Sequence, residues 1–320
     1  MEEHFVIGTD IGATWVRIVL SNVKGEFLAR KQERIDVTDK EAISRQIVRL
    51  ARELCQSEGI AIDDLKGLGI ASAGPLDPEK GILINPTNIP FDRVPLTRPI
   101  SDELGLSSML VNDCVAGVLG EKHFGAGREV EDLVYITIST GIGGGAILGG
   151  NLVLGKDGNA AEIGHFTIDY EERLQCGCGK RGHWEAYCSG KNIPNFVRMK
   201  RDEMGADRFR GSSLEEHLKD DFNNLTAKEL FDKAKEDDQL ASELVYEVGR
   251  LNAIGFASVV NAYDPALITV GGSVALNNED LVLDPIKKEI ENHVTNRTPQ
   301  IQLTQLAGDI GLYGAVAVIV

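Results

Sequence analysis

The residues best placed to do chemistry in this chain lie in two glycine-rich turns, each between apolar runs. The first is Phe5–Thr14 (FVIGTDIGAT) and the second is Leu133–Gly145 (LVYITISTGIGGG). Glycines let the backbone reach positive φ and bring its N–H groups close to an anion, so such turns can wrap phosphate oxygens. Asp10 in the first turn would repel phosphate unless a divalent cation lay between them. Together the turns predict a magnesium-nucleotide site.

Neither turn would support this prediction alone, because a glycine-rich loop after a strand is often a plain hairpin. A Rossmann motif requires a helix directly after the turn. Here the branched run Val16–Leu20 follows, which is typical of a strand. The P-loop pattern is absent as well. A duplicated hairpin that holds a nucleotide from both sides is the interpretation that remains.

Composition bounds the class of protein. The 320 residues are 42% hydrophobic and 26% charged, which is enough for two lobes with a cleft. The net charge of −16 disfavours nucleic acid or an anionic membrane as partner. No apolar run could span a bilayer, and the acidic start Met1-Glu-Glu-His does not resemble a signal peptide, so we expect a cytoplasmic protein. Five cysteines do not form a disulfide framework, and a reducing compartment with a metal site fits them better.

Several further elements follow from hydrophobic periodicity. A helix is expected from the capping-box spacing of Thr38–Glu41 to Gly59. Six prolines between Ser72 and Pro99 predict a long loop without regular structure. A strand at 108–111 should end at Asn112-Asp113, before a helix at 116–124. This placement puts both side chains at the carboxyl end of a strand, where α/β sheets present ligand-binding groups.

The second half of the chain is expected to be more helical. Residues 195–237 are polar and predict short surface helices without assignable chemistry. A long helix is expected at 239–262, followed by a strand at 266–270 that leads into a third glycine turn, Gly271-Gly272-Ser273. The chain should end in a helix that packs back on the first lobe.

Five segments, in this order, resemble the ROK family of sugar kinases in the actin-like ATPase superfamily. They are Asp10–Thr14 (DIGAT), Asn112-Asp113, Ser139–Gly144 (STGIGG), Glu162–His165 (EIGH) and Cys176–Glu185 (CGCGKRGHWE). The resemblance covers essentially the whole chain. It implies an α/β, two-lobed actin-like ATPase (ribonuclease H-like) fold with an interlobe cleft. The small N-terminal lobe would comprise residues 1–112 plus 306–320, and the large C-terminal lobe would comprise residues 113–305 with a zinc-binding knuckle. It also implies MgATP-dependent phosphorylation of a hexose, usually at O6, and a homodimer.

The resemblance assigns roles to individual residues. Asp10 would orient Mg2+, and the nucleotide would lie on the two phosphate turns and near the third turn, at Gly12, Ala13, Thr14, Thr140, Gly141, Gly271, Gly272 and Ser273. The sugar pocket would use Gly74, Asn88, Asn112, Asp113, Glu162, His165 and Glu185. Two positions depart from the family pattern. Ala13 replaces a glycine, which requires negative φ there, and Thr87 stands where proline is usual.

The side-chain inventory fits this chemistry. A hexose presents hydroxyls that both donate and accept, so its pocket needs carboxylates and amides. Phosphoryl transfer requires in-line positioning, a cation and one carboxylate to accept the proton of the attacking hydroxyl. Asp113 is our candidate for that base. A turn or helix N-cap is the structural alternative for Asn112-Asp113.

Three functional alternatives stay open. One is an N-acetylhexosamine kinase, since the pocket residues fit glucose, mannose, N-acetylglucosamine or N-acetylmannosamine. A second is a non-enzymatic sugar sensor of ROK type, which would carry a helix-turn-helix domain before the kinase-like body; we expect no room for one here, because the Asp10 turn begins almost at the amino terminus. A third is another actin-fold activity, which would not explain the stretch from Glu162 to Glu185.

A structural zinc site of Cys2His2 type is expected at His165, Cys176, Cys178 and His183. Zn2+ takes four such ligands, and Gly177, Gly179 and Gly182 would let the loop bend around it. ROK proteins usually have cysteine where His183 stands. The alternative is that the metal is lost and both cysteines are merely small residues in a tight loop. The knuckle would hold His165 by one nitrogen, leave the other for the sugar, and fix Glu185.

Overall fold

The computed structural model describes residues 4–86, 88–156 and 158–320, which form two compact units. Unit 1 comprises the described residues up to Val130 together with Gln305–Val320, and unit 2 comprises Glu131–Thr304. The first boundary differs from the expected one after Asn112. Helix α3 (Asp113–His123) belongs to unit 1, because its Ala116 packs with Ala315 of the carboxyl-terminal helix and Ala71 of a central strand in a buried cluster of small residues.

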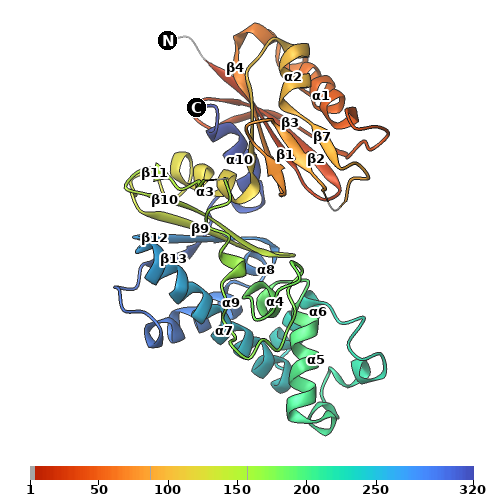
Figure 1. Ribbon diagram of the computed structural model, residues 1–320, viewed down its shortest axis with the longest axis vertical. Coiled ribbons are helices and arrows are strands. Elements are labelled where there is room, and N and C mark those ends of the chain that lie inside the picture. The colour runs from red at the N-terminus through yellow and green to blue at the C-terminus, as the bar shows by residue number, and fades with distance from the viewer. Residues whose placement is uncertain (1–3, 87, 157) are drawn as a thin grey trace. The chain divides into compact units, whose positions relative to one another are not determined.

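Unit 1 is built on a five-stranded mixed sheet in the order β3-β2-β1-β4-β8 (Figure 1). Strands β1, β2 and β3 are antiparallel, whereas β4 and β8 run parallel to β1. The strands are β1 (Phe5–Ile11), β2 (Trp15–Asn22), β3 (Phe27–Arg34), β4 (Leu65–Ser72) and β8 (Ser108–Asn112). The expected hairpin around the first turn is therefore confirmed.

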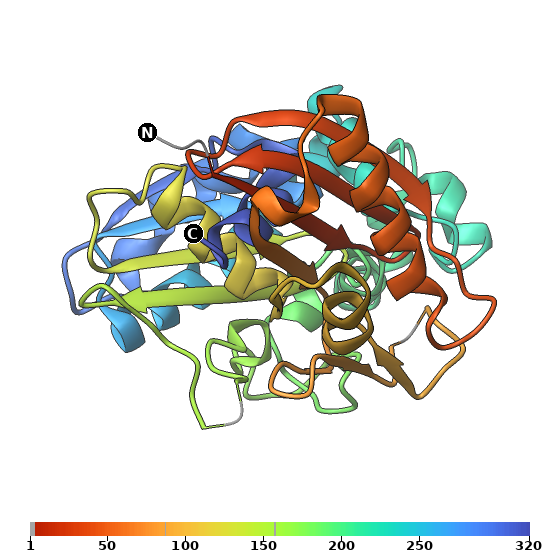
Figure 2. The same ribbon diagram turned by 90° about the horizontal axis from the view of Figure 1, so that it is seen from above.

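Side-chain alternation along β1 gives the sheet of unit 1 two buried faces. Ile7 and Ile11 belong to one core with helix α1 (Ala42–Glu58), while Val6 belongs to another with α10 (Ile310–Ala317). Figures 1 and 2 show α1 and α10 on opposite faces of these strands. The carboxyl-terminal helix thus packs on the first unit, as expected.

Two local expectations for unit 1 were wrong. Helix α1 begins at Ala42 without a side-chain cap, because Asp36 and Asp39 instead accept hydrogen bonds from the N–H groups of Thr38 and Glu41. The helix does end at Gly59, as expected. The proline-rich stretch is also partly regular, since prolines are tolerated at strand ends and in a first helical turn. It contains β5 (Leu76–Asp77), β6 (Ile82–Ile84), β7 (Arg93–Pro95) and the start of α2 (Thr97–Leu104).

Unit 2 repeats the sheet pattern of unit 1. Its order is β11-β10-β9-β12-β13, with β9, β10 and β11 antiparallel and with β12 and β13 parallel to β9. The strands are β9 (Leu133–Ile138), β10 (Ile142–Leu148), β11 (Asn151–Leu152), β12 (Leu267–Gly271) and β13 (Gln300–Leu303). The second glycine turn therefore joins β9 to β10 as the first joins β1 to β2, which confirms the predicted duplication.

The helices of unit 2 bury a large apolar core against this sheet (Figure 1). They are α4 (Glu185–Cys188), α5 (Ile193–Met204), α6 (Ala227–Lys235), α7 (Gln239–Tyr263), α8 (Ser273–Leu276) and α9 (Glu279–Glu289). The long helix expected at 239–262 is confirmed. Within the described parts of the chain, no helix combines the length and the apolarity that a membrane span requires.

Candidate functional site

The first glycine turn closes the β1–β2 hairpin through a hydrogen bond of 3.0 Å from Gly12 N to Trp15 O. Of the described residues, Gly12, Ala13 and Thr14 are not among those with positive φ. The alanine at position 13 is therefore compatible with the turn, as its replacement of glycine required. Contrary to our expectation, Gly12 does not adopt a left-handed backbone conformation in this turn.

Asp10 is the penultimate residue of strand β1 and is nearly buried, with 9% of its surface exposed. Its Oδ2 accepts hydrogen bonds from two nitrogens of Arg17 on β2, with Nε at 2.9 Å and Nη2 closer still. The carboxylate is thus held as an ion pair rather than free in a loop. Sequence reasoning missed Arg17, although it stands opposite Asp10 in the hairpin register.

Asn112 and Asp113 lie where β8 passes into α3. The Asn112 side chain caps the helix by accepting a hydrogen bond of 2.8 Å from Cys114 N, and Asp113 Oδ1 accepts from the same N–H at 2.9 Å. The expected helix start at Ala116 was therefore too late, because this cap begins α3 at Asp113. The positive end of the helix dipole favours negative charge at this position.

Two further expected sugar-pocket residues belong to unit 1. A side chain at Gly74 would begin 3.6 Å from the Asn112 amide nitrogen, so the structure brings Gly74 and Asn112 together. Asn88 is exposed in the loop between β6 and β7. The neighbouring departure from the family pattern, Thr87, lies outside the described residues.

Other groups approach the second glycine turn closely. A Cβ at Gly141 would lie 2.6 Å from Oε2 of Glu185. Glycines 141 and 143–145 of this turn are likewise not among the described residues with positive φ. The turn is held by backbone hydrogen bonds from Gly190 N to Ser139 O (2.7 Å) and from Lys191 N to Thr140 O (3.2 Å).

Glu185 connects this turn to the cysteine-containing loop. Its Oε2 accepts a hydrogen bond of 3.0 Å from Ile142 N, and its Oε1 lies 3.5 Å from Cys176 Sγ. Glu162 approaches the same region, with a carboxylate oxygen 3.8 Å from His165 Nε2. Three of the expected sugar-binding side chains, Glu162, His165 and Glu185, are therefore gathered beside the second turn.

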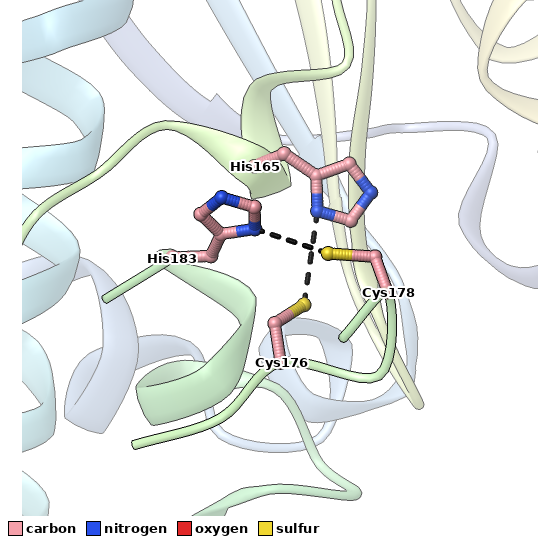
Figure 3. A group of neighbouring side chains, drawn as sticks. All are labelled: His165, Cys176, Cys178 and His183. Carbon is pink, nitrogen blue, oxygen red and sulfur yellow. Dashed lines mark hydrogen bonds between the residues drawn. The ribbon is translucent and has the colours of Figure 1, made fainter. Parts of the chain in front are cut away.

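The four expected metal ligands converge. The candidate ligand atoms of His165, Cys176, Cys178 and His183 all lie within 4.8 Å of one another (Figure 3). His165 Nδ1 is 3.7 Å from Cys176 Sγ, and His183 Nδ1 is 3.3 Å from Cys178 Sγ. With Zn–S of about 2.3 Å and Zn–N of about 2.0 Å, ligand atoms of a tetrahedral site stand about 3.3 to 3.8 Å apart. The donor set and these two distances fit zinc.

The protonation states of this cluster also bear on metal binding. Burial lowers the pKa of His183, as does the neighbouring His165, which favours the neutral imidazole that acts as a ligand. Burial raises the pKa of the Cys176 thiol to about 12. A divalent cation would stabilise the thiolate that burial disfavours.

A buried polar network supports the Cys/His knuckle (residues 176–183) from behind. The Tyr187 hydroxyl donates to Asp169 and accepts a hydrogen bond of 2.9 Å from Leu174 N. Arg173 Nε donates to the same Asp169 oxygen at 3.0 Å. Although burial raises the pKa of Asp169, the hydrogen bonds from Arg173 and Tyr187 outweigh it and hold this pKa below its usual value.

The third glycine turn borders a cavity of 760 Å³ within unit 2. Gly272 has a φ of 87°, and a Cβ there would lie 2.4 Å from Ile138 O, so only glycine fits. Ser273 Oγ lies 3.1 Å from Ser139 Oγ, which joins the second and third turns. The cavity is lined by both turns, by Lys191 and by Phe231 of α6, and its volume is ordinary for a cofactor-sized ligand.

Three lysines line this cavity, in a protein whose net charge is −16. Lys228 forms an ion pair with Asp232, and Lys235 donates to Asn277 O at 2.9 Å. Lys191 follows the residue that bonds to Ser139 O. The stretch 195–237, to which we assigned no chemistry, thus supplies one wall of the cavity, a role that its polar composition did not reveal.

Comparison with known proteins places the whole chain in one family. The ROK family model matches residues 6–320. A glucokinase from Pyrobaculum calidifontis is 35% identical over 311 residues, which is 97% of this chain and 93% of that protein. The match is thus neither local nor confined to one unit.

Solved structures of ROK kinases are similar to this chain over nearly its whole length. A ROK hexokinase from Thermus thermophilus has a TM-score of 0.79 at 29% identity and is covered over 97% of its chain and 98% of this one. A ROK family glucokinase from Streptomyces griseus, in complex with glucose and AMPPNP, has a TM-score of 0.75 at 30% identity with 98% of each chain covered. The α/β fold described above is accordingly the actin-like ATPase fold of these kinases.

Proposed function

Because this chain belongs to the ROK family and is an ATP-dependent sugar kinase, we propose that it transfers the γ-phosphate of MgATP to the 6-hydroxyl of glucose. The choice of glucose rests on the glucokinases to which the chain is similar over nearly its whole length. The related structure with glucose and AMPPNP supports glucose as the phosphoryl acceptor and ATP as the phosphoryl donor.

The observation that carries this proposal is the position of Glu185. Its carboxylate accepts a hydrogen bond from the second glycine turn and lies beside the Cys/His knuckle. The carboxylate that we assign to the sugar and the turn that we assign to the phosphates are thus parts of one hydrogen-bonded framework. Such a framework suits a reaction in which positioning supplies most of the catalysis.

The sugar would be held by donors and acceptors at Gly74, Asn88, Asn112, Asp113, Glu162, His165 and Glu185. His165 would contribute Nε2, because its Nδ1 points to Cys176 (Figure 3). Each sugar hydroxyl left without a partner would cost about 1 to 3 kcal/mol, which is how such a pocket would select among hexoses.

Phosphoryl transfer would proceed with Asp113 as general base. As the sugar oxygen O6 bonds to the γ-phosphorus, its proton passes to the Asp113 carboxylate, and the bond from the γ-phosphorus to the bridging oxygen breaks to release ADP. The products are the sugar 6-phosphate and ADP, and the base returns its proton to solvent.

The nucleotide would use the three glycine turns. We assign the adenosine to the cavity beside Gly272 and Ser273, and the phosphates to the turns at Gly12–Thr14 and Thr140-Gly141. Mg2+, when bound, would neutralise phosphate charge, and Asp10 is the carboxylate that would orient it. Lys191, which lines the cavity and follows the second turn's backbone partner Gly190, would add positive charge near the phosphates.

The cluster of His165, Cys176, Cys178 and His183 would hold a structural Zn2+, as its donor set and spacing indicate. The metal would cross-link the knuckle and so fix His165 and Glu185 for the sugar. We also propose a homodimer, on family resemblance. Sedimentation velocity that shows only monomer at working concentrations would remove that proposal.

A panel of glucose, mannose, N-acetylglucosamine and N-acetylmannosamine with MgATP tests the proposal. We expect hexose-dependent ADP release with the highest kcat/KM for glucose. A higher kcat/KM for either N-acetylhexosamine would contradict the assigned substrate while leaving the kinase activity intact.

A further inference from the structure

We propose that Arg17 is a positioning residue for phosphoryl transfer, which fixes the carboxylate of Asp10 and leaves its Oδ1 available to the divalent cation. The inference rests on the proposed function, in which Asp10 orients Mg2+. Neither the turn motif nor the family comparison assigns a role to Arg17. The argument comes from the contacts of its guanidinium group.

The hairpin register brings the two side chains together. Asp10 of β1 and Arg17 of β2 are direct cross-strand partners, so their side chains leave the same face of the sheet. Both Nε and Nη2 of Arg17 donate to one oxygen, Oδ2. Among the described residues, no hydrogen bond is made to Oδ1. The two oxygens of the carboxylate are thus distinguished by Arg17.

The other side of the guanidinium is anchored to the carboxyl-terminal segment. Nη1 donates to Gly308 O at 2.7 Å and lies 3.7 Å from a carboxylate oxygen of Asp309. Helix α10, which follows, places Gly311 against Asp10, where a Cβ would be 2.9 Å from Asp10 Cγ. Arg17 therefore connects the first phosphate turn to the entry of α10, and Asp10 is confined between them.

Arginine suits this role better than lysine. Its planar fork donates in several fixed directions at once, whereas a lysine ammonium is one point on a flexible stem. Only arginine can hold Asp10 Oδ2 and Gly308 O together at these distances. Outer partners of a metal-orienting carboxylate typically affect metal affinity or activity by about 10- to 100-fold.

A competing account of the Arg17–Asp10 ion pair predicts the opposite change in the effect of Mg2+ on nucleotide binding. If the ion pair merely masked Asp10 from the metal, removing Arg17 would strengthen the effect of Mg2+ on nucleotide binding. If Arg17 positions Asp10, removal weakens that effect. The sign of one measured change therefore separates the two accounts.

The test uses the full-length variants Arg17→Gln and Arg17→Lys. We expect Arg17→Gln to lower kcat by about 10- to 100-fold with little change in the KM for sugar, and Arg17→Lys to recover part of the loss. Calorimetry with AMPPNP, without sugar, gives the ratio of affinities with and without Mg2+. This ratio should fall in Arg17→Gln, and a rise would overturn the proposal.

A double mutant shows whether Arg17 acts through Asp10. In an Asp10→Asn background, adding Arg17→Gln should change kcat less than twofold, because the group to be positioned is already lost. Multiplicative losses would overturn the proposal. Arg30→Gln is the matched control, since the Arg30 guanidinium lies 3.6 Å from Asp309 and is well exposed; it should retain wild-type activity. Thermal unfolding of each variant accompanies the kinetics.

A failure of the proposed function can be distinguished from a failure of the role proposed for Arg17. Wild-type protein without hexose-dependent ADP release would contradict the proposed function. Active wild-type protein with an unaltered Arg17→Gln variant would contradict only the role of Arg17.

Discussion

The Glu185 carboxylate accepts a hydrogen bond of 3.0 Å from the backbone N–H of Ile142 and lies 3.5 Å from Cys176 Sγ, so it links the second glycine turn to the Cys/His knuckle. Backbone hydrogen bonds from Gly190 and Lys191, which follow α4, hold the same turn at Ser139 and Thr140. Ligands on the two sides of this framework should therefore affect each other's binding. Glu185 is the side chain through which such coupling can be tested.

Glu185→Ala should weaken the binding of both ATP and sugar, whereas Glu185→Gln should weaken mainly the binding of sugar. The glutamine oxygen can still accept from Ile142 N, but alanine leaves that N–H without its partner, at a cost of about 1 to 3 kcal/mol. Steady-state kinetics should show a raised KM for ATP in Glu185→Ala only. Equal KM values for ATP in both variants would contradict the coupling. Glu216→Ala, an exposed glutamate of unit 2, is the control.

Asp113→Asn should abolish turnover and leave sugar binding largely intact. The amide keeps the size and an acceptor for Cys114 N but cannot accept the hydroxyl proton, and general-base contributions are typically 10² to 10⁴ in rate. Single-turnover kinetics and sugar titration of the same variant measure the two effects separately. Near wild-type turnover at saturating substrates would rule Asp113 out as the base.

Cys178→Ala should lose zinc and raise the KM for sugar. The Cys178 thiol is exposed, so its removal does not empty the core, but it takes one of four converging ligands. Elemental analysis before and after chelator treatment measures the metal. Cys55→Ala, which removes a buried thiol from unit 1, should keep the metal. Wild-type activity with far less than one zinc per chain would contradict the structural role.

The network behind the knuckle should make stability depend on acid pH. Because the pKa of Asp169 is lowered in the folded state, its ionised form contributes stability above the unfolded pKa of about 3.9, and this contribution is lost as pH falls through the lower folded value. Asp169→Asn should therefore lower the Tm at pH 7, and the difference from wild type should shrink from pH 5 toward pH 3. A difference that is constant across this range would contradict the assignment.

The sequence predicted the parts of the fold that local pattern determines. The hairpins around Gly12 and Gly141, the helix that ends at Gly59 and the long helix predicted at 239–262 all follow from alternation, periodicity or caps. The domain boundary did not, because α3 joins unit 1 through tertiary contacts of Ala116 that no local pattern encodes. The small sheet of β5, β6 and β7 was missed because proline content outweighed three short strands.

For the candidate site, residue type and spacing were sufficient where the ligands are close in sequence, as in the Cys/His knuckle. They were not sufficient for partners that depend on register or long-range packing. Arg17 could have been found by counting across the turn from Asp10. The contact of Glu185 with Ile142 and the cavity wall supplied by α6 depend on how unit 2 folds, and nothing in the local sequence indicates them.

The most direct test of the central claim is the product formed from glucose and MgATP. We predict stoichiometric ADP and glucose 6-phosphate, with phosphorus-carbon coupling in the NMR spectrum at C6, and no ADP release without sugar. The same mixture with Asp113→Asn should give no product on that timescale. Absence of sugar-dependent ADP release with every hexose of the panel, from folded wild-type protein, would contradict the account.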